Sequence, residues 1–247
     1  MNIIVFDTET TSINKPFAYN IGYKIVNTET RETIVRRDYV VEQVWQNLEL
    51  FSTAYYCEKR QIYVSRMKAR KVIQDKIGYI CRQMYRDIKQ NEIEHGYAYN
   101  SGFDIGVFDF CCEWYKIQNP LDNIKVHDIW GFVSEFISST EDYQNFCETN
   151  ELFTESGNYS ASAESVYKYI TKNLEFVEEH TALADSEIET EILFECVDRG
   201  ADLLQDYKVV KVLERLEEKQ LIIKQDGQET EFTYKKKYCR GNTIYLK

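Results

Sequence analysis

Two acidic residues, Asp7 and Glu9, follow directly on an apolar stretch at the start of the chain. Residues 2–6 are apolar and β-branched enough to predict a strand that is buried on both faces. Residues i and i+2 of a strand point to the same face, about 7 Å apart at Cα. Two buried carboxylates need a positive partner, and Mg²⁺ takes carboxylate oxygens. The alternative is an exposed strand end with two solvated acids.

Two further acids, Asp104 and Asp185, each stand at the head of the apolar face of a predicted helix. The first helix is expected from residues 101–102 to about 118, with an inward stripe of Val107, Phe108, Cys111 and Tyr115. The second is expected over 181–198, where Ile188, Ile192 and Glu195 continue the face that Asp185 begins. An Asp at a helix start is often only an N-cap, but both of these acids are directed toward the sheet.

His180 stands five residues before Asp185, in a chain with three histidines. A single histidine at such a place is more often a surface or capping residue. Just ahead of an inward-facing Asp, it also becomes a candidate to accept a proton, because an unperturbed imidazole has a pKa of about 6.5.

The elements that must position these side chains can be read in order along the chain. Residues 17–27 and 32–41 are β-rich and, with the first strand, predict an antiparallel meander with a turn at 28–31. Residues 93–100 and 124–127 predict two more strands, and a helix is expected after a cap at Ser160 or Ser162.

A long helical section is predicted between residues 44 and 91. Its clearest stripe contains Ile73, Ile77, Ile80, Met84 and Ile88. Its first half is rich in tyrosine, lysine and arginine. Such a mixture can follow a single nucleic-acid strand, or it can be a solvated helix face over a core that contains tyrosine.

Three segments, FDTET, YNSGFDIGVFDF and HTALADSEIETEIL, together resemble the three exonuclease motifs of the DEDDh family of 3′→5′ exonucleases. The resemblance covers about residues 1–200. It implies an α/β fold with an RNase H-like mixed sheet of five strands flanked by helices. It also implies Asp7, Glu9, Asp104 and Asp185 as ligands of two Mg²⁺ or Mn²⁺ ions, with His180 as the general base. Tyr99 departs from the family, in which many members have histidine, and so does the 44–91 insertion.

This chemistry suits the residues. Two metal ions about 3.5–4 Å apart can hold the attacking and leaving oxygens of a phosphodiester and offset the developing charge. The family implies release of nucleoside 5′-monophosphates from single-stranded 3′ ends. Candidates to hold the terminal nucleotide are the backbone at Thr8 and Thr10, together with Asn100 and the ring of Phe103. Phe103 could equally belong to the core.

Composition limits the remaining possibilities. The 247 residues carry a net charge of -11, which argues against broad, non-specific binding to nucleic acid. Seven scattered cysteines without a CxxC pair favour a reducing, cytoplasmic location, and no signal peptide or membrane-spanning segment is expected. From the resemblance we expect an exonuclease, with DNA as the favoured substrate, that works alone or with a polymerase or another replication or repair protein. The alternatives are an RNase acting on short or structured RNA, and a binding module on an exonuclease scaffold.

The last forty residues differ in charge from the rest. Residues 208–247 contain ten Lys or Arg and six Asp or Glu, a balance of +4, whereas the remainder balances at -15. We predict an exonuclease domain over 1–206 and an appendage over 207–247. The appendage should contain a helix at 209–219 and a hairpin that turns at Asp226-Gly227.

Overall fold

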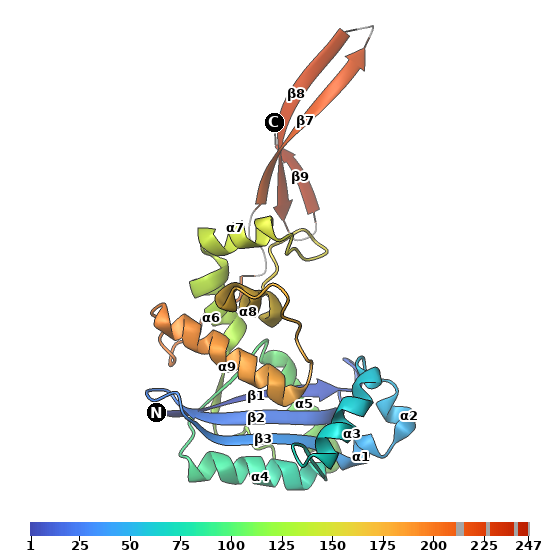
Figure 1. Cartoon of the computed structure of the whole chain (residues 1–247), viewed down its shortest axis with the longest axis vertical. Helices are drawn as coiled ribbons and strands as arrows, with labels where there is room; N and C mark the ends of the chain where they lie inside the picture. Colours follow the sequence, from blue (N-terminus) through green and yellow to red (C-terminus); the bar gives the residue numbers. More distant parts are fainter. Residues whose placement is uncertain (211–214, 226–227, 240–241, 247) are drawn as a thin grey trace.

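The main domain is built on a mixed sheet of six strands in the order β4-β3-β2-β1-β5-β6 (Figure 1). The computed structural model describes residues 1–210, 215–225, 228–239 and 242–246, and side chains through residue 210. β1, β2 and β3 are antiparallel neighbours, whereas β5 runs parallel to β1, β6 to β5 and β4 to β3. The strands are β1 (Asn2–Thr10), β2 (Ala18–Asn27), β3 (Thr33–Val41), β4 (Ile73–Asp75), β5 (His95–Ala98) and β6 (Lys125–Asp128).

Helices cover both faces of this sheet. They are α1 (Glu42–Trp45), α2 (Leu48–Phe51), the 3₁₀ turn η1 (Cys57–Lys59), α3 (Arg60–Lys68), α4 (Ile77–Gln90), α5 (Gly102–Tyr115), α6 (Ile129–Val133), the π-helical segment η2 (Ser134–Ser138), α7 (Glu141–Thr149), α8 (Ala163–Thr171) and α9 (Ala182–Asp198). In the described part of the chain, no helix combines the length and the apolar composition that crossing a membrane would require.

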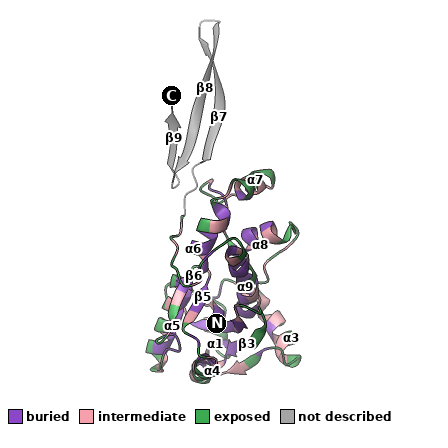
Figure 2. Cartoon of the chain, turned by 90° about the vertical axis from the view of Figure 1, so that its left-hand side faces the viewer, coloured by how far each residue is buried: buried purple, intermediate pink, exposed green. Residues whose placement is uncertain are grey.

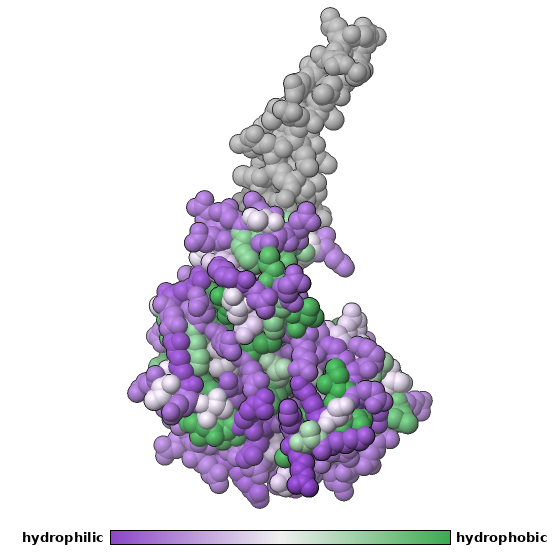
Figure 3. Space-filling model, in the orientation of Figure 1, coloured by the Kyte–Doolittle hydropathy of each residue, from purple (hydrophilic) through white to green (hydrophobic). Residues whose placement is uncertain are grey.

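Two hydrophobic cores lie on opposite faces of the sheet, because successive strand residues point to opposite sides. Ile4 and Phe6 of β1 pack with α4 and α5, whereas Ile3 and Val5 pack with α6 to α9. Figure 1 shows α4 and α9 on opposite sides of the strands, and Figure 2 shows buried residues concentrated along the strands and α9. The face seen in Figure 3 is mostly hydrophilic, with separate hydrophobic patches. Most of the buried apolar surface therefore lies between the sheet and the helices that cover its two faces.

Most predicted elements of the main domain are present. The meander forms β1 to β3, the two later strands are β5 and β6, and the helices expected at 101–118 and 181–198 are α5 and α9. Ser162 caps α8 by accepting a hydrogen bond from the Ser165 amide at 3.2 Å. The α/β mixed sheet flanked by helices is thus confirmed.

The predicted number of five strands was wrong because of β4. Residues 73–75 pair with residues 39–41 at the edge of β3, so this segment gains backbone hydrogen bonds that a helix start would not provide. Ile73 is 48% exposed and does not belong to the helical stripe. The stripe begins at Ile77 and continues through Ile80, Met84 and Ile88, all of them buried in α4.

The C-terminal residues form a separate three-stranded antiparallel sheet of β7 (Arg215–Gln225), β8 (Gln228–Cys239) and β9 (Asn242–Leu246). The helix predicted over 209–219 was wrong, because residues 215–219 belong to β7 and pair with residues 234–238 of β8. Gln225 pairs with Gln228, which agrees with the predicted two-residue turn, although Asp226 and Gly227 lie outside the described residues. The division at residue 206 remains a prediction.

Gly22 allows α9 to approach the sheet very closely. A Cβ atom at this position in β2 would overlap the backbone of Ala182 and Leu183, in the first turn of α9. Because Asp185 lies in this first turn, the closeness of the helix to β2 determines how far Asp185 stands from Asp7 and Glu9 on the neighbouring strand.

We predict that Gly22→Ala lowers the free energy of unfolding by about 1–3 kcal/mol or more, because the overlapping atoms are backbone and cannot rotate away. Urea unfolding followed by circular dichroism measures the change. Gly106→Ala is the matched control, since a Cβ there meets nothing within 4 Å, and alanine is favoured in a helix interior. Equal stability of the Gly22→Ala variant and the wild type would contradict the close approach.

Candidate active site

Three of the predicted acids meet at the end of β1. Asp7 and Glu9 lie on the same face of this strand, and Asp185 approaches from the first turn of α9. Carboxylate oxygens of the three lie within 4.8 Å of one another. The helix is held there by Asn20 of β2, whose Oδ1 accepts a hydrogen bond from the Ala182 amide at 2.8 Å. Two separate elements thus converge on one small volume.

The fourth acid, Asp104, is attached to β1 through Thr8. It lies in the first turn of α5 and is 2% exposed. The Thr8 hydroxyl donates to Asp104 Oδ1 at 2.6 Å, and the Thr8 amide donates to the same carboxylate. Since Thr8 stands between Asp7 and Glu9, these bonds place Asp104 beside both. The Thr8 side chain is buried, and its hydroxyl group is used in the hydrogen bond to Asp104.

Sequence reasoning missed a fifth acid, Glu189. It lies one turn after Asp185 on α9 and is 4% exposed. One of its oxygens accepts the Tyr99 amide, whereas Oε2 is buried without a hydrogen-bond partner. Glu195, which was predicted to face inward, is only partly buried and pairs with Arg199 at 2.9 Å. The spacing of four from Asp185 could have indicated Glu189 instead.

The acidic side chains repel one another and are poorly hydrated. Burial raises the pKa of Glu9 to about 8, that of Asp104 to about 7 and that of Asp185 to about 9. Burial, then repulsion by Asp104 and the other acids, raises the pKa of Asp7 well above its ordinary value. Asp185 Oδ1 is buried and has no hydrogen-bond partner. A set of carboxylates with unpartnered oxygens fits a hard divalent cation such as Mg²⁺ or Mn²⁺.

His180 lies outside this carboxylate group. Its ring stacks on Tyr56, with 4.4 Å between ring centroids and 12° between planes, and its Nδ1 lies 3.7 Å from Glu178 Oε2. Lys59 lies in η1, and its positive charge partly offsets the rise in pKa that burial causes at Glu9 and Asp185. Lys59 and Tyr56 belong to the 44–91 insertion, which lies outside the three motifs. The spacing of the motifs therefore could not predict that these two residues contact the site.

A cavity of about 470 Å³ adjoins the acids. Among its lining residues are Thr8, Glu9 and Thr10 of β1, Tyr55 and Tyr56 of the insertion, and Phe103. Phe103 is partly buried, with one side packed against the core that contains α5. Three of the four predicted substrate-binding residues thus share one cavity. Asn100 does not line this cavity. It lies in the turn after β5 with an exposed side chain, and its backbone N–H donates to Asp128 Oδ1 at 2.9 Å.

No protein-family model and no curated protein matches the sequence, but solved structures match the fold. The nuclease domain of 3′hExo, a DEDDh family member bound to rAMP, has a TM-score of 0.57 and 11% identity, covering 86% of this chain and 97% of that one. The chain has a DEDDh exonuclease-like fold. A 3′-exonuclease whose structure concerns 3′-end specific recognition of a histone mRNA stem-loop gives a TM-score of 0.56 and 11% identity, covering 94% of this chain and 90% of that one.

A full-length 3′-exonuclease has a TM-score of 0.51 and 13% identity, covering 94% of this chain and 66% of that one. These likenesses confirm that the resemblance seen in the three motifs extends to a DEDDh exonuclease-like fold. At such low identity they concern the fold alone, and the roles of the individual site residues remain predictions.

We predict that the metal-free protein loses stability as pH rises. An acid whose pKa is raised by folding contributes its stability below its unfolded pKa, near 4, and loses it as pH rises through the folded pKa. The folded values of about 7 to about 9 for Asp104, Glu9 and Asp185 place the loss between pH 4 and 9. In EDTA, the Tm should therefore fall from about pH 6 to about pH 9, and the gain in Tm on adding Mg²⁺ should grow over the same range.

Scanning calorimetry at constant ionic strength measures this effect. Glu189→Gln should weaken the dependence on pH, because one of the repelling charges is absent. A Tm that rises with pH in EDTA, or that is unaffected by Mg²⁺ at high pH, would contradict the assignment of these carboxylates as a cation site.

Proposed function

We propose that this protein is a metal-dependent 3′→5′ exonuclease that hydrolyses the terminal phosphodiester bond of single-stranded nucleic acid and releases nucleoside 5′-monophosphates. The observation that carries the proposal is the convergence of Asp7, Glu9 and Asp185 within 4.8 Å, with Asp104 bonded to Thr8 between them. This arrangement stands on a DEDDh exonuclease-like fold. The direction of digestion and the product follow from the motif resemblance.

Each residue has a part in this reaction. The four carboxylates would bind two Mg²⁺ or Mn²⁺ ions, and bound ions lower the pKa of a coordinated water and offset the charge that develops on the phosphate. His180 would accept the proton of the attacking water. The cavity beside Glu9 is wide enough to take a terminal nucleotide, with the Phe103 ring available for stacking and the backbone near Thr8 and Thr10 for hydrogen bonds.

The proposed substrate is single-stranded DNA, with RNA as the second candidate. RNA is favoured by two of the structural neighbours, of which one was bound to rAMP and the other recognises a histone mRNA stem-loop.

The six cysteines whose side chains are described are all free, which supports the proposed cytoplasmic location. A polymerase or other replication or repair partner stays a prediction. The rival proposal of a binding module without catalysis would leave the buried acids of the site without a role.

We predict that Asp7→Asn and Asp185→Asn each abolish cleavage while the fold persists, because an amide keeps the shape but loses the charge that holds the cation. Digestion of 3′- and 5′-labelled DNA and RNA oligonucleotides with Mg²⁺ measures this, and it also determines direction and sugar preference. Asp142→Asn on the exposed face of α7 is the matched control. Full activity of either site variant would contradict the metal assignment, and an inactive wild type would favour the binding module.

We further propose that the basic appendage holds nucleic acid or a partner and takes no part in the chemistry. Lys235, Lys236 and Lys237 lie in β8. In the backbone register of the sheet, Lys235 stands opposite Glu218 of β7, and Lys236 opposite Glu217. The alternative is a sheet that covers apolar surface of the main domain and keeps its lysines in solvent.

We predict that changing these three lysines to glutamine raises KM on long strands and flattens the dependence of affinity on salt. Each lost phosphate contact on a single strand lowers the slope by about 0.7. Turnover of a dinucleotide should not change, because it reaches only the metal site. Kinetics at two salt concentrations measure the effect. An unchanged slope, with aggregation on deletion of residues 208–247, would favour the covering role.

A further inference from the structure

The segment that carries His180 is held by the insertion. Lys59 Nζ donates to the Glu179 carbonyl at 2.7 Å and lies 4.4 Å from the centroid of the Tyr56 ring. Arg66 of α3 donates to Thr181 Oγ1 at 2.9 Å and pairs with Glu179. These contacts attach the residues on both sides of His180 to the insertion, so the histidine does not depend on its own loop alone for its position.

The backbone and ring of His180 are themselves constrained. Its φ is 51°, in the left-handed region that few residues other than glycine adopt. In this conformation its ring stacks almost parallel on that of Tyr56. Packing between two flat rings restricts both side-chain torsions of the histidine, which an exposed loop residue would otherwise sample freely.

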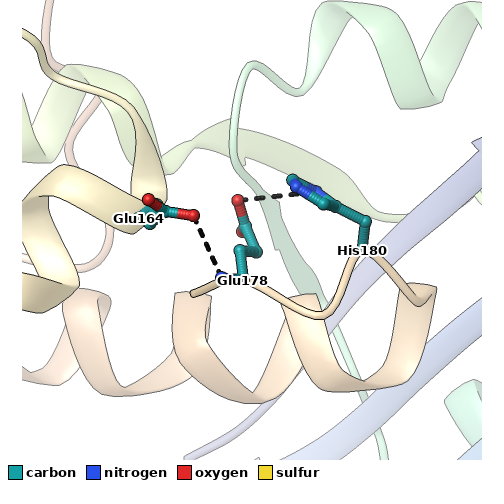
Figure 4. Close-up of side chains that lie close together, drawn as sticks. All are labelled: Glu164, Glu178 and His180. Carbon is teal, nitrogen blue, oxygen red and sulfur yellow. Dashed lines mark hydrogen bonds and ion pairs between the residues drawn. The ribbon is translucent and has the colours of Figure 1, made fainter. Parts of the chain in front are cut away.

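Glu178 lies beside the His180 ring, on the side of Nδ1 (Figure 4). Its Oε2 lies 3.7 Å from His180 Nδ1. Glu178 is fixed by α8, because its amide donates to Glu164 Oε2 at 3.0 Å and Glu164 pairs with Lys168 at 2.7 Å. Burial, then repulsion by Glu164, raises the pKa of Glu178 to about 7. Once ionised, Glu178 favours the tautomer of His180 that carries its proton on Nδ1, so that the lone pair on Nε2 is left to accept a proton.

We propose that Tyr56 and Glu178 are positioning residues for the general base: Tyr56 fixes the plane of the His180 ring, and Glu178, next to Nδ1, favours the tautomer that leaves Nε2 free to accept a proton. This inference rests on the proposed exonuclease function. Neither residue needs to touch the substrate or the metal ions for this role. It also gives the 44–91 insertion a part in the chemical step, since Tyr56 belongs to it.

The test compares Tyr56→Leu, Tyr56→Phe and Glu178→Gln with the wild type in steady-state digestion of a labelled oligonucleotide. Loss of a side chain that orients a reacting group costs about 10–100-fold in activity, so Tyr56→Leu should lower kcat by about 10-fold or more, with KM unchanged. Tyr56→Phe keeps the ring and should keep most of kcat. Glu178→Gln should also lower kcat, whereas the exposed matched control Glu175→Gln should not.

A double-mutant cycle separates positioning from other roles. His180→Ala alone should cost about 10²–10⁴-fold, and adding Tyr56→Leu or Glu178→Gln should then cost little more, because the group that they position is absent. Independent, multiplying effects would overturn the proposal. So would a rise in KM with Tyr56→Leu, since Tyr56 lines the nucleotide cavity and would then act on the substrate.

Ring placement is also measured without activity, by NMR of the histidine side chains. The His180 signals, identified by their loss in His180→Ala, should be displaced by the Tyr56 ring current in the wild type and in Tyr56→Phe, but not in Tyr56→Leu. Absence of that displacement would overturn the proposal. Displaced signals in a wild type that digests neither DNA nor RNA would show that the exonuclease function itself is wrong, and would overturn the role in catalysis.

Discussion

One buried side chain, Asn20 of β2, connects the elements that hold the site. Its Nδ2 donates to Asp38 Oδ1 at 2.7 Å and to the Tyr39 carbonyl at 2.9 Å. Its Oδ1 accepts from the Tyr63 hydroxyl at 2.9 Å and from the Ala182 amide at 2.8 Å. All four of its hydrogen-bonding positions are thus occupied. Because each buried polar group left without a partner costs about 1–3 kcal/mol, few other arrangements of these elements can be stable.

This network explains how repelling carboxylates can be kept together without a cation. The first turn of α9 is held by Asn20 and fits against Gly22, so the position of Asp185 is determined by backbone contacts and not by its attraction to anything in the site. Asp104 is held differently, by two hydrogen bonds that Thr8 donates to its carboxylate. The repulsion is then an energetic cost of the metal-free state, offset by the two hydrophobic cores and relieved when a cation binds.

The parts of the fold that sequence predicted are those with a long, regular pattern. The alternation and length of residues 17–41 predict a meander, and the stripes of α5 and α9 place Asp104 and Asp185 at the sheet. β4 has only three residues, too few for any period, and its formation depends on the free edge of β3. The segment 215–219 carries apolar and charged residues that suit either a helix or a strand, and pairing with β8 decides between them.

Within the site, sequence indicated the acids that lie near the end of β1 or in the first turn of a helix, and it missed what tertiary packing adds. Glu189 is one of several glutamates along α9; its spacing of four from Asp185 places it on the same face, and its burial beside Tyr99 then distinguishes it from the exposed ones. The stacking of His180 on Tyr56 joins residues more than a hundred positions apart. No local period predicts such a contact, since it depends on how the insertion packs on the sheet.

The insertion also contains fewer free basic residues than its sequence suggested. Lys59 and Arg66 bond to the segment before α9, and the Arg60 guanidinium lies 3.9 Å from the Trp45 ring centroid. The exposed basic residues of the insertion lie near the end of α3 and along α4: Lys68, Arg70, Lys71, Lys76, Arg82, Arg86 and Lys89. The insertion therefore has two roles. Its Tyr55 and Tyr56 line the cavity beside Glu9, and its Lys59 and Arg66 hold the segment that carries His180. Tyr56 both lines this cavity and stacks on His180. Under the proposed function, substrate choice and the chemical step would therefore be coupled through Tyr56.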